Sequence, residues 1–308
     1  MQRTLPYQLT DNLFVLGDDL FLTYLLRGEN CTLLDLGASG SAPLVERQLR
    51  QLGIANEDVE HLVVLHAHWD HVCGLPYFRE FFPNATVLGS AKSREVLGKA
   101  KIVEQFREND ERWCTRLRDS GHLEELPAFL SYNRISVDQV VEDEQTVELG
   151  GIPVRFLATP GHSPCSLSAH LPTERALLVS DAIGFYLPEV DGFLPMFFQS
   201  VEQTLDSIDR VAGIDVDILG YGHAVNLLIE GRDEIAHGCR RIQEQTLELA
   251  AGIRAMAAAG EAEEAMLETI HQVAYRDFLA RLYLPDYLRG VAPFLLKAIL
   301  RAESLAAV

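Results

Sequence analysis

The sequence predicts an α/β protein that carries a helical insertion and a helical C-terminal extension. Over roughly the first 228 residues, short apolar segments of strand length alternate with amphipathic segments of helix length. Beyond them the strand signals stop, and Ala, Leu, Glu and Arg, which favour helices, predominate. The chain has 308 residues, of which 48% are hydrophobic, so it can bury a substantial core.

The N-terminal part predicts strands followed by a helix and a further, buried strand. A helix is expected over 41–53, because leucines and a valine recur at helical spacing between a Ser-Ala-Pro start and a closing glycine. The uniformly apolar run 61–66 predicts the buried strand. The earlier strands are expected at 12–17, 20–28 and 31–37.

Residues 90–134 differ from their surroundings, because they are charged and only weakly apolar. We expect a mostly helical insertion on the surface of the core. Strand signals return after it and are interrupted by one helix, predicted over 200–213. The strands of this part are expected within 146–151, 152–161, 166–172, 175–182 and 216–223.

The C-terminal extension predicts two helices, at 232–260 and 261–275, and further helical pieces bracketed by Pro285 and Pro293. The chain contains neither an internal repeat nor a low-complexity linker. We therefore expect the extension to pack on the core.

Composition narrows the class of partner. There are 26 basic against 45 acidic residues, a formal net charge of −19. Binding to nucleic acid or to an anionic membrane needs clustered Lys and Arg, so we expect neither. A run of about 18 apolar residues is absent, and the N-terminal stretch lacks a signal-peptide pattern, so the cytoplasm is the expected compartment. Five widely spaced cysteines fit reduced thiols.

The densest polar cluster is the segment His-Ala-His-Trp-Asp-His at 66–71, directly after the apolar run. His66 and His68 are two residues apart, so both point to one side of an extended backbone. Asp70 and His71 follow a bend and can point to a second centre. Neutral imidazole and carboxylate are ligands of Zn²⁺ and related ions, so the segment predicts a metal site.

Three later strands also end on a residue of ligand type. His162 and His223 each follow a glycine after an apolar strand, and Asp181 directly closes another. One such strand end carries little information. Four in one chain indicate a common site, because strand ends along one edge of a layered α/β protein converge.

The motifs HxHxDH, TPGH, an aspartate after a strand, and GHA occur in this order. The sequence thereby resembles the metallo-β-lactamase superfamily of hydrolases over residues 1 to about 228. This resemblance implies an αββα sandwich, two packed β-sheets with helices outside. The catalytic core would span 1–228, with the insertion at about 90–134, and a helical lid would span 229–308. A dinuclear site for divalent ions (zinc, iron or manganese) would complete the core.

The resemblance also implies a role for each ligand residue. One metal would be held by His66, His68 and His162, the other by Asp70, His71 and His223, and Asp181 would bridge them. Asp70 would in addition be a catalytic residue that holds or moves a proton. Two such ions share and activate a water molecule, which attacks the electrophilic carbon or phosphorus of a substrate. Ser163 and Ser180 flank ligands, and local turn bonding and packing explain them.

The segment 184–200 is unusually aromatic for a loop and follows Asp181. It is expected to line a substrate pocket or to anchor the helical extension, and both roles are compatible. Two tyrosines, at 186 and 221, are candidate donors to a developing oxyanion. The candidate substrate contacts are Phe185, Tyr186, Phe193, Met196, Phe197 and Tyr221.

The extension resembles the C-terminal helices of glyoxalase II-like thioesterases and of the bacterial quinolone-signal thioesterase in its position and in its helix-favouring composition. A hydrolase of a thioester or lactone of a small acyl substrate is therefore favoured, with a homodimer as one compatible assembly. Arginines of the extension, at 240, 241, 276, 281 and 289, are candidates to meet an anionic thiol carrier.

Two other functions remain open. A dinuclear-iron oxidoreductase of the flavodiiron type shares the fold, but its pattern has a carboxylate where this chain has His68. A regulatory or ligand-binding protein that holds metals without turnover is the other alternative.

Overall fold

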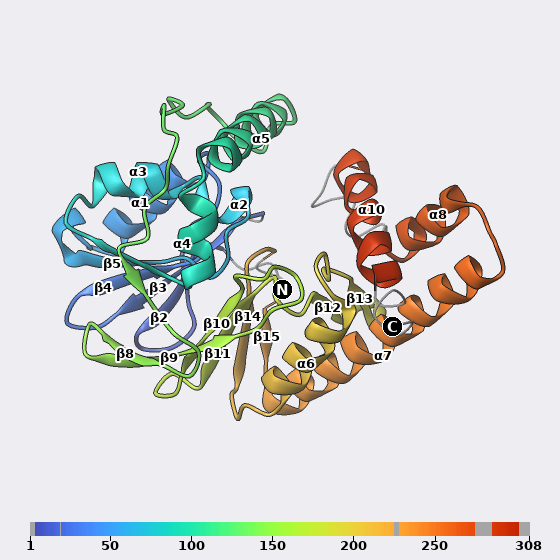
Figure 1. The fold of residues 1–308 in the computed structure, drawn as a ribbon. Coiled ribbons are helices and arrows are strands. Elements are labelled where there is room, and N and C mark those ends of the chain that lie inside the picture. The colour runs from blue at the N-terminus through green and yellow to red at the C-terminus, as the bar shows by residue number, and fades with distance from the viewer. Residues whose placement is uncertain (1–3, 19, 225–227, 275–284, 302–308) are drawn as a thin grey trace. The chain divides into compact units, whose positions relative to one another are not determined.

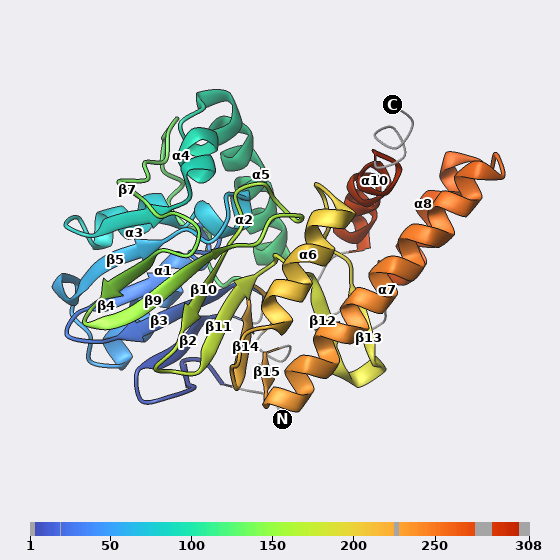
Figure 2. The same ribbon diagram turned by 60° about the horizontal axis from the view of Figure 1, so that its bottom comes forward.

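The computed structural model describes residues 4–18, 20–224, 228–274 and 285–301 (Figures 1 and 2). It is a mixed α/β structure with two main sheets, which confirms the predicted class. By internal contacts the chain forms two compact units, and the expected division at residue 228 stays a prediction. The first unit comprises 1–158, 167–180 and 221–226, and the second comprises 159–166, 181–220 and 227–308.

In the first unit a seven-stranded sheet keeps its strands in chain order. The first four strands pair antiparallel and the remaining neighbours pair parallel, with Leu13 opposite Leu26 and Leu33 opposite Leu62. The strands are β1 (Tyr7–Gln8), β2 (Leu13–Gly17), β3 (Leu22–Arg27), β4 (Cys31–Leu34), β5 (Val59–Val63), β6 (Thr86–Gly89) and β7 (Gln139–Val140).

Strands β2 and β4 are buried at every position, as expected for strands covered on both faces. Helix α1 (Ala42–Gln51) packs on β2 and on α3 (Leu75–Phe81), and both helices lie on the outer face of this sheet (Figure 1). A second set of strands belongs to the same unit, and its consecutive members pair antiparallel. They are β8 (Thr146–Leu149), β9 (Ile152–Ala158), β10 (Leu167–Leu171) and β11 (Ala176–Ser180).

The insertion is helical only in its first part, as α4 (Ala91–Leu97) and α5 (Ala100–Asp119). Residues 121–138 are irregular, so the expectation of mostly helical structure up to 134 is wrong there. The α5 helix packs against the short helix α2 (Trp69–Val72), and the rings of Trp69 and Trp113 lie 6.1 Å apart. The insertion therefore supports the segment that carries Asp70 and His71.

The second unit contains four long helices and two strand pairs among its described residues. Helix α7 contacts α6 and the strands β12, β13 and β15, and α10 contacts α7 and α8. The elements are β12 (Phe185–Leu187), the 3-10 helix η2 (Pro188–Val190), β13 (Gly192–Leu194), α6 (Val201–Ala212), β14 (Ile218–Tyr221), β15 (Ile229–Glu230), α7 (Arg232–Ala258), α8 (Glu263–Ala274) and α10 (Pro285–Arg301).

Two expectations about this unit are corrected. The aromatic segment 184–200 is in large part a β-hairpin rather than a loop. Pro293 does not separate two helical pieces, because α10 continues through it. Its ring is on an exposed part of the helix. None of the helices in the described residues is both long and apolar enough to cross a membrane.

Candidate metal centre

The segment 66–71 has the predicted geometry. After β5 the chain stays extended through His68, whose φ and ψ are −89° and 154°, and then bends into α2. Asp70 and His71 are therefore placed on the first turn of a helix. Gly74 begins α3 with an ordinary φ, but a Cβ atom there would lie 2.2 Å from the carbonyl oxygen of Leu36. Close approach of the backbone, rather than the turn itself, requires this glycine.

In the first unit, His71 and His223 face each other. His71 Nδ1 bonds Asp35 Oδ1 at 2.7 Å, and His223 Nδ1 bonds the carbonyl oxygen of Leu20 at 2.6 Å. A carbonyl and a carboxylate only accept, so both Nδ1 atoms carry hydrogen and, in the neutral rings, both Nε2 atoms are acceptors. These Nε2 atoms lie 3.0 Å apart, and Asp70 Oδ2 lies 3.8 and 3.7 Å from them.

This arrangement of donors fits a cation. Asp70, His71 and His223 are buried and place one ligand atom each within 4.8 Å of the others. Three acceptors that converge away from water repel each other unless a positive charge lies between them. A divalent ion bound by imidazole and carboxylate satisfies all three at once.

A second chain of hydrogen bonds orients His66. The Ser180 hydroxyl donates to Asp35 Oδ2 at 2.5 Å, and its oxygen lies 3.2 Å from His66 Nδ1. The His66 ring lies 4.1 Å from that of His71, centroid to centroid, and 4.8 Å from that of His68. One buried carboxylate, Asp35, thus fixes two of the predicted ligands, the usual arrangement around metal-bound histidines.

In the second unit, His162 is oriented by the same kind of hydrogen bond. His162 Nδ1 donates to the carbonyl oxygen of Met196 at 2.7 Å, so its Nε2 is the acceptor atom, 3.8 Å from Asp181 Oδ2. Gly161 adopts a φ of 130°, and a Cβ atom there would collide with the backbone of Thr204. The predicted glycine turn before His162 is therefore confirmed, and His162 and Asp181 are both buried.

Backbone strain accompanies these residues. Asp35, Ser180 and Ala224 have positive φ angles of 61°, 50° and 54°, which residues with a Cβ atom rarely adopt. Asp35 and Ser180 form the hydrogen-bond chain, and Ala224 follows His223. Strain of this kind persists where the surrounding structure enforces it, often at functional sites.

The predicted substrate contacts are core residues in this structure. None of the six is more than 7% exposed. The Tyr186 hydroxyl donates to Asp191 Oδ1 at 3.0 Å, which engages it within the hairpin. Their role toward a substrate stays a prediction. The side chains concerned are Phe185, Tyr186, Phe193, Met196, Phe197 and Tyr221.

Asp191 holds the hairpin on α7. Its carboxylate accepts a hydrogen bond from His237 at 2.9 Å and forms an ion pair with Arg241, whose Nε lies 3.1 Å from Asp191 Oδ2. Its carbonyl oxygen accepts from Arg241 and Gln245. These three partners are four residues apart and share one helix face. Of the arginines expected to meet an anionic carrier, Arg241 is thus engaged, while Arg276 and Arg281 lie outside the described residues.

Sequence reasoning missed Asp35 and the linking role of Ser180. A signal for Asp35 was present, because it closes an apolar strand as Asp181 does. Ser180 directly precedes Asp181, and local turn bonding does not account for it.

Beneath α2 lies a further ionisable group, Asp110 of α5. It is 1% exposed, and its Oδ1 accepts the Ser39 amide hydrogen at 3.0 Å. Burial raises the pKa of Asp110 to about 6. The residue links the insertion to the loop that begins at Asp35.

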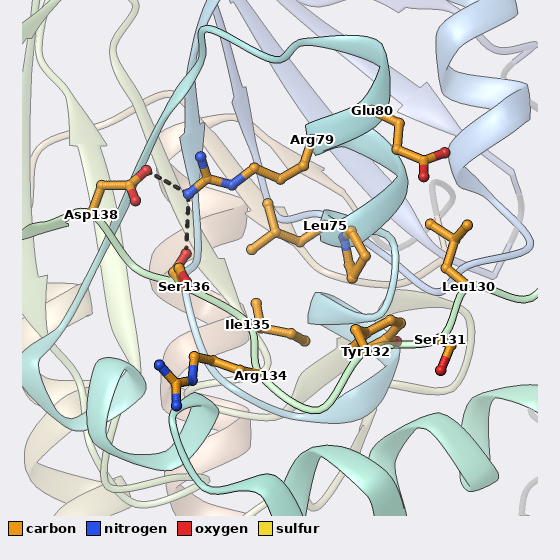
Figure 3. Close-up of a pocket in the computed structure, with 11 residues that line it drawn as sticks. Leu75, Arg79, Glu80, Leu130, Ser131, Tyr132, Arg134, Ile135, Ser136 and Asp138 are labelled. Atoms are coloured by element: carbon orange, nitrogen blue, oxygen red, sulfur yellow. Dashed lines mark hydrogen bonds and ion pairs between the residues drawn. The ribbon is translucent and has the colours of Figure 1, made fainter.

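A separate cavity of about 440 Å³ lies in the first unit, between α3 and residues 130–138 (Figure 3). The Arg79 guanidinium in its wall is paired with Asp138 and with the carbonyl oxygen of Ser136. None of the predicted site residues lines this cavity.

Comparison with known proteins agrees with the fold and the motifs. Residues 20–223 match the family model of the metallo-beta-lactamase superfamily, which is more than half of the chain. The chain belongs to this superfamily, and the predicted αββα fold type is confirmed.

Particular relatives are distant. "Beta-lactamase-like protein 2 homolog" of Caenorhabditis elegans is 24% identical over 226 residues, covering 72% of this chain and 63% of that protein. "Glyoxylase B2" of Dictyostelium discoideum is 24% identical over 132 residues, 42% of this chain and 37% of that protein. The chain thus spans less than two thirds of either relative.

A solved metallo-beta-lactamase variant from Cronobacter sakazakii has the same fold. Its TM-score is 0.57 at 20% identity, over 82% of this chain and 99% of that one.

Proposed function

We propose that this protein is a hydrolase that activates water with two divalent metal ions and cleaves a thioester or lactone of an acyl substrate. The observation that carries the proposal is the arrangement of three buried imidazoles, His71, His223 and His162. Each bonds a protein acceptor through Nδ1 and presents Nε2 to a carboxylate. Such oriented, neutral histidines are typical of metal centres.

We further propose that all seven predicted ligands share one site. Chain connectivity supports this. His162 lies in the short connection between Ala158 and Leu167, which are paired neighbours in β9 and β10. Asp181 directly follows Ser180, whose hydroxyl belongs to the Asp35 hydrogen-bond chain. The family match also includes every one of these residues.

Asp35 and Asp70 would have different roles in this reaction. A bound metal pair would supply Lewis acidity, which lowers the pKa of a water molecule and polarises the substrate oxygen. Asp35 keeps His66 and His71 in the tautomer in which Nε2 is the acceptor atom that a metal would bind. Asp70, whose carboxylate faces His71 and His223, is positioned to hold a proton at its free oxygen and to pass it to the leaving group.

The comparisons and the helical extension favour a thioester or a lactone as the substrate. The superfamily is mostly hydrolytic, and a protein named Glyoxylase B2 is among the relatives. The position of the helical extension resembles that in thioesterases of this superfamily. No serine or cysteine nucleophile is required, because water is the nucleophile.

A substrate panel tests the proposal. Protein loaded in turn with zinc, manganese and iron is assayed on acyl-coenzyme A, glutathione thioester, homoserine lactone and phosphodiester substrates, and its metal content is measured by elemental analysis. We expect metal-dependent turnover of a thioester or a lactone. His223→Ala and Asp181→Ala should lose both bound metal and activity.

The matched control is His122→Ala, because His122 is exposed and its ring bonds Ser120, away from the predicted ligands. It should retain metal and activity. Full activity in the His223 and Asp181 variants would refute the site. Oxygen reduction by the iron form, without hydrolysis, would favour the oxidoreductase alternative.

A further inference from the structure

We propose that Phe198 and Phe294 form an apolar wall beside His162 that binds the chain of the acyl group, so that the substrate carries an extended apolar acyl chain. The inference rests on the proposed function and names the substrate class more closely. It differs from the expectation of a pocket lined by the hairpin aromatics.

Phe198 is held firmly next to His162. The Met196 carbonyl oxygen accepts hydrogen bonds both from His162 Nδ1 and from the Phe198 amide. The Gly161 carbonyl oxygen accepts from the amides of Gln199 and Ser200, at 2.8 and 3.1 Å. These bonds tie the loop of His162 to the segment of Phe198. Its ring therefore lies 4.9 Å from the His162 ring, inclined by 46°.

Phe294 continues the apolar surface from α10. Its ring lies 5.9 Å from that of Phe198, measured between ring centroids. The residue as a whole is nevertheless 56% exposed to solvent. The helix beneath it is anchored, because Leu295 and Ile299 are buried and the Ile299 carbonyl oxygen accepts from Arg254. The ring is thus presented to solvent by a packed helix, not by a frayed end.

Burial separates these two rings from the other aromatics of the region. The hairpin aromatics Phe185, Tyr186 and Phe193 are at most 3% exposed. Phe198 is only half-buried. Among the described residues of the second unit, Phe198 and Phe294 therefore present exposed ring surface next to the predicted ligand His162. A chain that extends from a carbonyl near His162 would cover it and remove apolar area from water.

The expected effect depends on chain length. Each methylene that the rings remove from water contributes about fourfold to binding. Covering about half of the exposed Phe294 ring is worth about tenfold in affinity.

The first experiment measures kcat/KM for acyl thioesters from acetyl to decanoyl. In the wild-type protein we expect a steep rise with chain length. Phe294→Ala should flatten this rise and lose about tenfold on the decanoyl substrate relative to acetyl. Leu247→Ala is the matched control, because Leu247 is likewise exposed, at 50%, but lies on α7. It should keep the wild-type slope. A wild-type slope in Phe294→Ala would overturn the inference.

A second experiment does not need turnover. Calorimetric titration of decanoate and of acetate into the metal-loaded and the metal-free protein measures the apolar subsite directly. We expect decanoate to bind more tightly than acetate, and Phe294→Ala to weaken decanoate about tenfold. Equal affinity of the wild-type protein and of Phe294→Ala for decanoate would overturn the inference.

The two proposals fail separately. If no thioester or lactone is cleaved but decanoate binding still depends on Phe294, the proposed reaction is wrong and the apolar subsite stands. If thioesters are cleaved with no dependence on Phe294, the reaction stands and the subsite is wrong.

Discussion

The substitution Asp110→Asn should change how the stability of this protein depends on pH. Asp110 of α5 is buried, and its pKa is raised to about 6, mainly because burial disfavours the charged form of the carboxyl group. In the unfolded chain the same carboxyl has a pKa of about 3.9. The folded state therefore holds a proton between these two values that the unfolded state has lost.

The sign and size of the effect follow from this difference. A pKa raised on folding stabilises the protein below about pH 4, and the contribution is lost as the pH rises through about 6. A difference of about 2 in pKa corresponds to about 3 kcal/mol between these limits. Asparagine keeps an oxygen that can accept the Ser39 amide hydrogen but does not ionise. The variant should gain about 3 kcal/mol relative to wild type from pH 4 to pH 7.

Urea unfolding of the metal-free proteins at intervals of pH measures this difference. All other titrating groups are common to both proteins, so the difference between their unfolding free energies isolates Asp110. Glu104→Gln, on the same helix but exposed, serves as the control and should show a much smaller change. A difference between Asp110→Asn and wild type that stays constant from pH 4 to pH 7 would refute the reasoning.

Two further substitutions test the site and the second unit. Asp35→Asn removes the carboxylate that binds both Ser180 and His71. Metal affinity, measured by competition with a chelator, should therefore fall about 10- to 100-fold. The control Asp119→Asn changes an exposed residue and should leave the metal affinity unchanged. Gly238→Ala would place a Cβ atom 3.0 Å from the Tyr186 ring and should destabilise the protein by about 1 kcal/mol net, whereas Gly252→Ala on the same helix meets nothing within 4 Å and should stabilise it. Thermal unfolding of both glycine variants checks these opposite signs, and destabilisation of equal size in both would contradict the packing argument.

Local patterns predicted most of the secondary structure. The helix at 41–53 and the strands β2 to β5 of the first sheet follow from periodicity and from their glycine and proline limits, whereas β1, β6 and β7 were not predicted. The prediction failed at 121–134, where charged residues without a strong periodicity are irregular. It also failed at Pro293, because packing of α10 on α7 and α8 tolerates a proline whose exposed position limits the cost.

For the candidate site, too, local motifs predicted one part and only the tertiary structure showed the other. The types, order and spacing of the predicted ligands were evident from motifs, since each motif follows one strand. The hydrogen-bond chain from Asp35 through Ser180 to His66 was not, because its members come from strands far apart in the sequence and no local pattern relates them.

The sequence by itself determined the superfamily, the α/β class and the residue types of the candidate metal site, because these depend on short motifs and on local periodicity. Only the tertiary structure decided which carboxylate orients the histidines and which aromatic rings remain exposed. Phe185 and Phe294 are equally hydrophobic as residues, yet one is 1% and the other 56% exposed. That difference arises from non-local packing, in which each side chain is buried by residues distant in the chain.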